Sequence, residues 1–278
     1  MSVFVCPVCR GGLNASDEML RCAQGHAFDL AKEGYVNLLL AAARKSKDPG
    51  YNKAMIASRH TLFESGHYQH LADAMAGIVA RNLPEDRITF VLDAGCGEGY
   101  YLRRIRAHTT TTQPSLSLIG VDVSKHGVRI ASRGDRLGEY AVASTHDLPL
   151  GDNSVDVLLT HFSPVFAGEF HRVVKPGGVV VVGAPGPRHL FGLKELVYDN
   201  AEQHTPSDPL DGAPGYELAA TDSVQYTLEI DNRDAIAALF AMTPFYWSAN
   251  HETQARIATL DQLHTEVDVI AYSYRVVK

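Results

Sequence analysis

Short apolar runs alternate with amphipathic stretches along the chain from about residue 88 onward. Uninterrupted apolar runs of this length are typical of strands buried on both faces, and the stretches between them have helical spacing. The pattern predicts strands near 88–93, 117–122, 139–143, 154–160 and 178–183, separated by helices near 99–107, 125–133 and 165–173. This alternation predicts an α/β fold with a doubly wound, mostly parallel sheet.

The two ends of the chain have other patterns. Towards the C-terminus we expect a helix over 188–200, and then strands near 222–230 and 265–277 that flank a helix over 233–242. These two strands make the predicted sheet seven-stranded. Before the sheet, two helices are expected over 53–64 and 67–83, preceded by a turn or linker at 45–52 that contains Asp48-Pro49-Gly50.

We therefore divide the chain into three parts. Residues 1–34 are expected to form a small module of short strands, 35–84 a linker with helices, and 85–278 the α/β domain. The first part has few apolar residues, so we expect a bound metal to supply much of its folding free energy.

A glycine-rich loop follows the first strand of the predicted sheet. The strand ends in Asp93, and Gly95, Gly97 and Gly99 follow at alternate positions. Glycines allow sharp turns and a close approach of the backbone to a ligand. The G-x-G-x-G spacing differs from the G-x-G-x-x-G of dinucleotide folds, and it favours S-adenosylmethionine. The alternative is an ordinary glycine-rich turn.

A second acid follows the next predicted strand. Asp122 ends the run 118–122, a position where doubly wound sheets hold a carboxylate facing the ribose hydroxyls of a nucleoside. The alternative is an ordinary acid at a strand end. Two further segments, 147–159 and 172–182, follow in register. Together the four elements resemble the class I S-adenosylmethionine-dependent methyltransferases in order and spacing.

Three of the four cysteines lie in the first 22 residues. Cys6, Cys9, Cys22 and His26 have the spacing Cys-x2-Cys-x12-Cys-x3-His. Three thiolates and one imidazole suit a tetrahedral zinc ion, and four protein ligands make the site closed and structural. The alternative is a set of free or disulfide-linked thiols. The fourth cysteine, Cys96, is expected to be a small packed residue of the glycine loop.

Charge and composition exclude further classes of protein. The net charge of −7 argues against a protein that grips nucleic acid with its whole surface, although residues 1–60 alone carry +3. Arg44, Lys45 and Lys47 are interpreted as a solvated linker. The chain has no run of eighteen apolar residues and no recognisable signal peptide, so we expect a cytoplasmic protein without a membrane span.

Segments spread along the whole chain resemble the RlmA family of 23S ribosomal RNA guanine-N1 methyltransferases. The segments are the Cys/His module, Lys32–Leu39, Lys47–Gly50, Gly66-His67-Tyr68, the glycine loop with Tyr100-Tyr101, Pro185–Leu190 and Met242–Phe245. The resemblance implies methylation of N1 of a guanine in a hairpin loop of 23S rRNA. It also implies a zinc module that helps to recognise RNA, and a homodimer that frames an RNA-binding cleft.

The resemblance also assigns residues. It implies that Cys6, Cys9, Cys22 and His26 bind zinc, that Gly97 and Glu98 lie against S-adenosylmethionine, and that Tyr68 and His189 reach the cofactor from outside the core sheet. The last four of these residues, together with Asp93, Gly95 and Asp122, form the expected cofactor site. From sequence alone, Tyr68 could be an interface aromatic residue and His189 a residue at a helix N-terminus.

One segment departs from the family pattern. The chain has His161-Phe162-Ser163-Pro164 where Gram-negative relatives tend to carry a Tyr-Ala-Pro sequence. Phe162 still offers a surface on which a base can stack. The sequence identifies no general base.

Two rival functions also fit part of the sequence. One is a small-molecule methyltransferase, for example one acting on a quinone, which has no evident need for a zinc module. The other is a non-catalytic RNA-binding protein on a decayed scaffold, against which the intact Asp93, Gly95, Gly97 and Asp122 argue.

Overall fold

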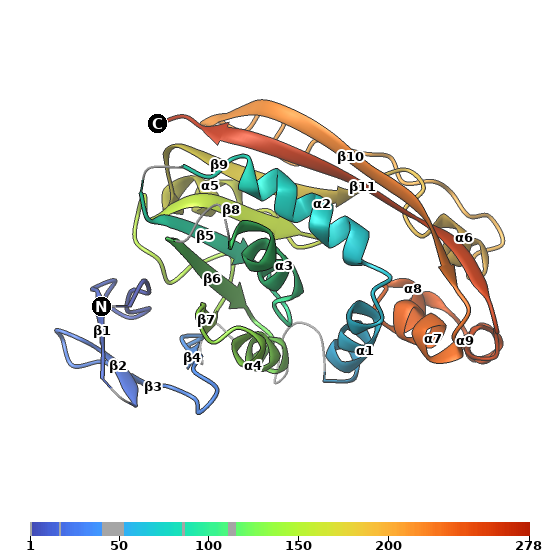
Figure 1. Cartoon of the computed structure of the whole chain (residues 1–278), viewed down its shortest axis with the longest axis horizontal. Helices are drawn as coiled ribbons and strands as arrows, with labels where there is room; N and C mark the ends of the chain where they lie inside the picture. The colour runs from blue at the N-terminus through green and yellow to red at the C-terminus, as the bar shows by residue number, and fades with distance from the viewer. Residues whose placement is uncertain (1, 17, 41–52, 85–86, 111–114) are drawn as a thin grey trace.

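The computed structural model describes residues 2–16, 18–40, 53–84, 87–110 and 115–278. Its centre is a parallel sheet formed by the predicted strands (Figure 1). The parallel strands are β5 (Thr89–Ala94), β6 (Leu116–Asp122), β7 (Glu139–Val142), β8 (Val155–His161) and β9 (Val174–Pro185). Two long antiparallel strands, β10 (Tyr216–Ile230) and β11 (Leu263–Val276), extend the sheet beyond β9.

The order of the strands is β10-β11-β9-β8-β5-β6-β7-β4. The eighth strand, β4 (Val36–Asn37), comes from the region predicted as linker and pairs in parallel with β7. In the register, Asp93 of β5 lies opposite Gly120 of β6 and Leu159 of β8. The carboxyl ends of these three strands therefore meet at one edge, where ligands bind in doubly wound sheets.

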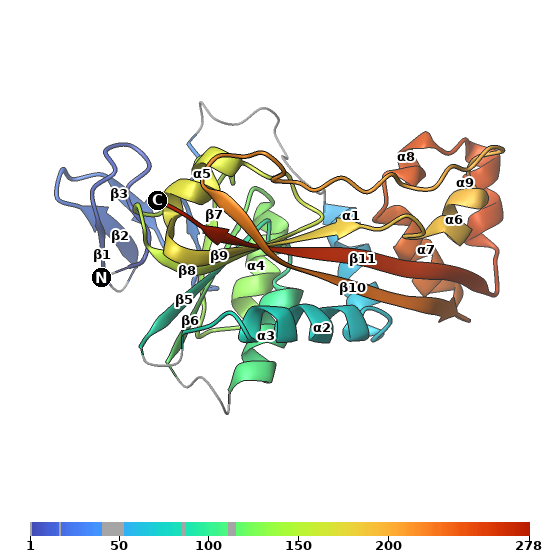
Figure 2. The ribbon, with the colours of Figure 1, turned by 90° about the horizontal axis from the view of Figure 1, so that it is seen from above.

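The two faces of the sheet have different covers (Figure 2). On one face, Val91 and its neighbours pack against helices α2 (Gln69–Ala80), α3 (Tyr100–Thr109) and α4 (Lys125–Gly134). On the other face, Leu92 and its neighbours pack against α5 (Ala167–Val173) and the N-terminal module. Successive residues of a strand point to opposite faces, so each strand contributes to both layers.

The N-terminal module is a three-stranded antiparallel sheet of β1 (Leu13–Ala15), β2 (Met19–Cys22) and β3 (Ala27–Asp29). It is packed onto the α/β domain, because Phe4, Leu13 and Leu20 share an apolar cluster with Leu148 and Leu150. The expectation that metal supplies much of its stability therefore needs an addition: burial against the α/β domain also stabilises the module.

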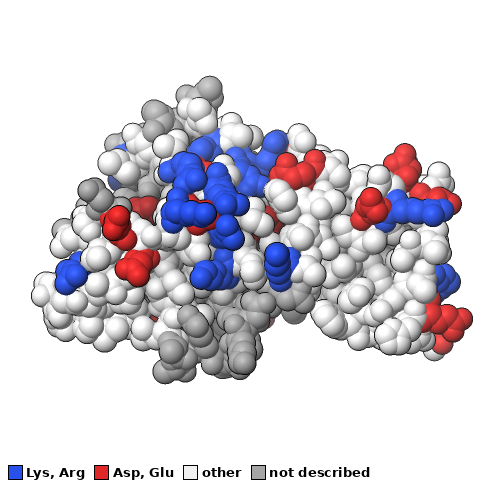
Figure 3. Space-filling view, turned by 90° about the horizontal axis from the view of Figure 1, so that it is seen from below, with Lys and Arg blue, Asp and Glu red and all other residues white. Residues whose placement is uncertain are grey.

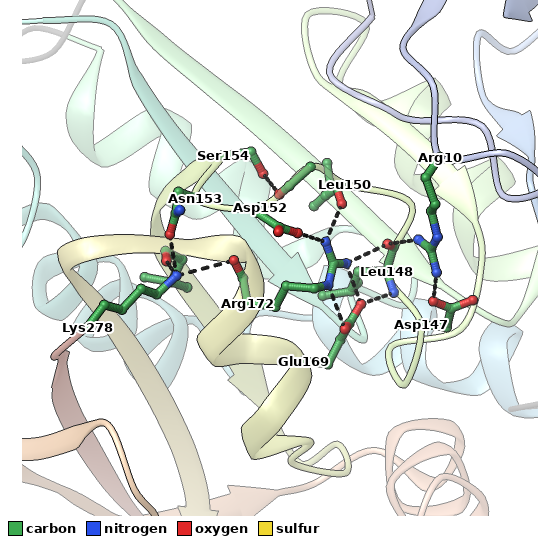
Figure 4. Close-up of polar contacts among 12 residues, drawn as sticks. Arg10, Asp147, Leu148, Leu150, Asp152, Asn153, Ser154, Glu169, Arg172 and Lys278 are labelled. Carbon is green, nitrogen blue, oxygen red and sulfur yellow. Dashed lines mark hydrogen bonds and ion pairs between the residues drawn. The ribbon is translucent and has the colours of Figure 1, made fainter.

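Polar contacts reinforce this packing (Figure 4). Arg10 of the module donates a 3.0 Å hydrogen bond to the carbonyl oxygen of Leu148 and forms an ion pair with Asp147. From the other side, Arg172 of α5 donates to the carbonyl oxygens of Leu148 and Leu150. The segment between β7 and β8 is thus held by the module and by α5 together.

Helices gather at the far end of β10 and β11 (Figure 1). These are α1 (Lys53–Glu64), α6 (Phe191–Glu195), α7 (Arg233–Ala241), α8 (Phe245–Ser248) and α9 (His251–Ala258). Helices α8 and α9 were not predicted. Within the described residues, no helix is long and apolar enough to cross a bilayer.

The prediction of a helix over 188–200 is wrong for most of this range, since only the short α6 forms there. The cause lies in β11. Leu190 adopts a left-handed conformation with φ 54°, and its N–H donates to the carbonyl oxygen of Glu266 at 2.7 Å. The chain before α6 is therefore bound to the sheet. The predicted turn at 45–52, with Arg44 before it, lies outside the described residues.

Candidate functional site

The glycine loop turns sharply between β5 and α3. Gly95 has φ 98°, and a Cβ at this position would lie 2.3 Å from Ser163 Oγ. Gly99 has φ 75°, and a Cβ there would lie 2.8 Å from the Cβ of Ala131 in α4. Both the backbone conformation and the close packing thus require glycine.

Asp122 fixes the shape of this loop. Its Oδ2 accepts a hydrogen bond from the N–H of Gly97 at 2.9 Å, and its Oδ1 accepts one from the N–H of Ser124 at 2.7 Å. Each oxygen keeps a further lone pair that a ligand hydroxyl can use. Burial raises the pKa of Asp122, and the two backbone hydrogen bonds oppose this effect.

Arg59 of α1 is a residue that the sequence analysis missed. Its Nε lies 3.3 Å from Glu98 Oε2, and a Cβ at Gly97 would lie 3.3 Å from its guanidinium. The Glu98 side chain is fully buried, and neither of its oxygens accepts a hydrogen bond within the described structure. Helix α1, which precedes the parallel strands in the chain, therefore places a cation over the glycine loop. No motif in the sequence marks this arginine.

Asp93 adds a third carboxyl group. It is buried, and its Oδ2 has no hydrogen-bond partner among the described residues. Burial, and then the neighbouring carboxylate of Asp122, raise the pKa of Asp93 to about 8. With Asp93 mostly protonated at pH 7, the carboxylates of Glu98 and Asp122 still outnumber the guanidinium of Arg59, so the site favours a ligand that carries positive charge.

A cavity of about 580 Å³ opens beside the loop, at the carboxyl ends of β8 and β9. Its walls include the aromatic and proline side chains of Phe63, Tyr68, Tyr101, Phe162, Pro164, Pro244 and Phe245; Arg59, His161 and His189 supply polar groups. The hydroxyls of Tyr68 and Tyr101 are buried without a hydrogen-bond partner in the described structure. Unsatisfied buried polar groups are rare, and several at one cavity indicate a place for a polar ligand.

Phe162 lines this cavity and has a strained backbone conformation. It has φ 52°, unusual for a bulky residue, and its side chain is 40% exposed. Its ring centroid lies 4.1 Å from that of His161 and 4.8 Å from that of His189. Strain of this kind persists where the surroundings hold it, and it is common at functional sites.

The two histidines beside Phe162 are neutral at pH 7. Burial lowers the pKa of His161 to about 3 and that of His189 to about 4. The backbone N–H of Asp268 donates to His189 Nδ1 at 3.3 Å, which leaves the proton of the neutral ring on Nε2. The ring nitrogens of His161 have no hydrogen-bond partner among the described residues.

The N-terminal module brings four metal-binding groups together. The ligand atoms of Cys6, Cys9, Cys22 and His26 all lie within 4.8 Å of one another. The two sulfur atoms of Cys9 and Cys22 are 3.6 Å apart, and His26 Nδ1 lies 3.3 Å from Cys22 Sγ. These separations and this donor set fit a structural zinc ion. Cys96 is buried elsewhere, in the glycine loop, where it packs against β6.

The structure thus places the residues expected at the cofactor site in two adjoining groups. Asp93, Gly95, Gly97, Glu98 and Asp122 surround the glycine loop, and Tyr68 and His189 line the aromatic cavity. Arg59 joins the groups, because it lines the cavity and also pairs with Glu98.

A doubly wound sheet with this loop and an acid after each of its first two strands defines a class I S-adenosylmethionine-dependent methyltransferase. In agreement, a family model described as a methyltransferase domain matches residues 92–182, and the model of the N-terminal domain of RlmA matches residues 4–47.

Two relatives match nearly the whole chain. The 23S rRNA (guanine(748)-N(1))-methyltransferase of Streptomyces fradiae is 34% identical over 93% of this chain and 91% of its own. A Bacillus subtilis protein, YxjB, provisionally named a 23S rRNA (guanine-N(1)-)-methyltransferase, is 30% identical over 96% of this chain and 95% of its own. The chain belongs to the RlmA family of 23S rRNA guanine-N1 methyltransferases. Its cofactors are S-adenosylmethionine and one structural zinc ion.

Proposed function

We propose that the protein transfers a methyl group from S-adenosylmethionine to N1 of a guanine in a hairpin loop of 23S rRNA. The observation that carries this proposal is the meeting of an acidic glycine loop with an aromatic cavity lined by unsatisfied polar groups. The small-molecule alternative is not favoured, because the relatives named for rRNA methylation align over the zinc module as well as the α/β domain.

The loop supplies groups for each end of the methyl donor. Asp122 has lone pairs for the ribose hydroxyls, and the carboxyl groups of Asp93 and Glu98 suit the cationic methionine end. Arg59 is the guanidinium available for the methionine carboxylate, which it would take in exchange for part of its contact with Glu98. Tyr68 and His189 close the site from the side of the cavity.

The cavity then receives the guanine. When bound, the cofactor supplies an electrophilic methyl group, so the protein mainly has to position the acceptor. Phe162 presents a ring face on which the base stacks, and its ring lies against those of His161 and His189. The Nε2–H of His189 is a fixed donor for an acceptor atom of the base. A base in a hairpin loop costs less to unstack than one in a duplex.

The remaining expectations belong to the same proposal. The module at 1–34 assists RNA recognition, residues 35–84 connect it to the domain at 85–278, and the protein works in the cytoplasm, where ribosomal RNA is its substrate. Two copies form a homodimer that frames the RNA. The zinc ion has four protein ligands, so it has a structural role and not a catalytic one.

A transfer assay tests the function. The zinc-loaded protein is incubated with tritiated S-adenosylmethionine and 23S rRNA from cells lacking this modification, and the product is digested to nucleosides. We expect label in N1-methylguanosine and a strong loss of label for Asp93→Ala. Label in another nucleoside would contradict the N1 assignment. Label in a quinone or another metabolite and none in RNA would favour the small-molecule alternative.

A further inference from the structure

Basic side chains gather on one face of the molecule, over α4 and the end of the N-terminal module (Figure 3). We call Lys32, Lys125, Arg129, Arg133 and Arg136 the basic patch; all five are exposed. Three of them follow one another at four-residue intervals along α4, which puts them on one side of the helix about 6 Å apart along its axis.

The basic patch is only partly neutralised. Arg129 Nε and Arg133 lie 2.8 Å and 3.2 Å from the same oxygen of Glu33, whose side chain is buried. Arg136 donates to the carbonyl oxygen of Glu33, and neither Lys32 nor Lys125 forms an ion pair within the described residues. Five cations therefore face one buried carboxylate, in a protein whose net charge is −7.

A recess of about 380 Å³ lies within the basic patch. Lys32, Lys125 and Arg129 line it, together with Glu33, Tyr35 and His126. Glu33 holds Arg129 at its wall, because a buried carboxylate and a guanidinium fix each other's position. The recess is thus a preformed, concave and positively charged surface, which suits an anion such as a phosphate group.

The basic patch is also close to the cofactor loop. Helix α4 begins directly after β6 and Asp122, and a Cβ at Gly127 in its first turn would lie 2.8 Å from the carbonyl oxygen of Gly97. The row of cations therefore starts within one helical turn of the glycine loop and leads from there towards the zinc module.

We propose that the basic patch binds the phosphate backbone of the substrate RNA and directs it from the zinc module to the cofactor site. This inference rests on the proposed rRNA substrate. An RNA strand fits better than a protein partner, because protein interfaces are centred on aromatic or apolar anchors and this surface presents a row of cations at regular spacing. The acidic remainder of the molecule repels RNA and so confines it to the basic patch.

The test uses Lys32→Glu and Lys125→Glu, since these side chains have no ion-pair partner among the described residues whose loss would unfold the protein. Binding of a 23S rRNA hairpin to the full-length protein is measured by fluorescence anisotropy over a range of salt concentrations. We expect each variant to weaken binding by about tenfold at low salt and to reduce the slope of log Kd against log salt by about 1. Cofactor affinity, measured by calorimetry, should not change.

The control is Arg275→Glu on β11, an exposed cation outside the basic patch. If Lys32→Glu and Lys125→Glu bind the hairpin no differently from this control, the basic patch does not bind RNA. If they bind the free hairpin normally and lose activity only on ribosomal particles, the partner is a ribosomal protein and the proposal is wrong. Failure of the wild-type protein to methylate any RNA would instead refute the proposed function.

Discussion

Arg59 Nε lies 3.3 Å from Glu98 Oε2, and this contact joins helix α1 to the glycine loop. The two residues come from different parts of the chain, and Glu98 has no solvent exposure. Since a buried carboxylate needs a compensating charge, the contact both stabilises the loop and positions a guanidinium beside the cofactor site.

Arg59→Ala should weaken the binding of S-adenosylmethionine by about 1.5–3 kcal/mol, because a charge-assisted hydrogen bond to the methionine carboxylate is lost. Arg59→Lys should recover part of the affinity. Isothermal titration calorimetry measures both. Methylthioadenosine, which lacks the carboxylate, is the matched ligand. An equal loss of affinity for methylthioadenosine would mean that Arg59 only shapes the loop.

Phe162→Ala should lower kcat/KM for rRNA, with a loss of about 1–3 kcal/mol of transition-state stabilisation, because one stacking surface for the base is removed. Cofactor affinity should stay unchanged. Phe162→Trp should retain most of the activity, while Phe162→Gly relieves the strain at φ 52° and still lacks the ring. Higher stability of Phe162→Gly together with low activity would show that strain is maintained for function. Full activity of both small variants would remove Phe162 from the acceptor site.

The raised pKa of Asp93, about 8, predicts a pH dependence of stability. An unfolded Asp titrates near pH ~4. Between these values the folded protein holds a proton that the unfolded chain has lost. The contribution to stability is therefore fully present below about pH 4 and is lost as the pH rises towards 8. The melting temperature of Asp93→Asn should therefore fall less steeply than that of the wild type as the pH rises over this range. The exposed variant Asp211→Asn should behave like the wild type.

The same group should couple cofactor binding to pH. A cationic ligand favours the ionised carboxylate, so binding of S-adenosylmethionine should release a proton at pH 7, and affinity should rise as the pH approaches 8. Calorimetry in buffers of different ionisation enthalpy measures the release. No proton release, or the same release from Asp93→Asn, would separate Asp93 from the cofactor.

Cys22→Ser should reduce the zinc content from about one ion per chain to none. RNA binding and rRNA methylation should fall together, whereas cofactor affinity should change much less, because the glycine loop belongs to a different core. Since Leu13 and Leu20 belong to the same apolar cluster as Leu150, the melting temperature of the whole protein should also fall. Cys96→Ala, which leaves the metal ligands intact, is the control and should keep its zinc. Loss of cofactor binding with normal RNA affinity would reverse these roles.

The sequence predicted the parts of the fold that depend on continuous local patterns. The apolar runs of β5, β6 and β8 and the spacing of Cys6, Cys9, Cys22 and His26 are features of this kind. It did not predict β4, which has two residues and depends on pairing with β7 about a hundred residues later.

The residues of the candidate site also divide into those set by local sequence patterns and those set by packing between distant segments. Asp93 and Asp122 could be predicted because each ends an apolar run, a position that the topology makes meaningful. Arg59 could not, because its place over Gly97 depends on how α1 packs and not on its neighbours in the sequence. The short α6 was mispredicted for a related reason, since a hydrogen bond from Leu190 to β11 overrides the local pattern.

Helix α4 has a consequence for engineering. Its first turn packs against Gly97, and its later turns hold Glu33 through Arg129, Arg133 and a hydrogen bond from Ser132. One helix thus contacts both the N-terminal module and the glycine loop and fixes their relative position. A chimera that takes only the N-terminal module from a relative would lose the matched contacts between this module and α4. The chimera should fold when the residues on the outer face of α4 are exchanged together with the module.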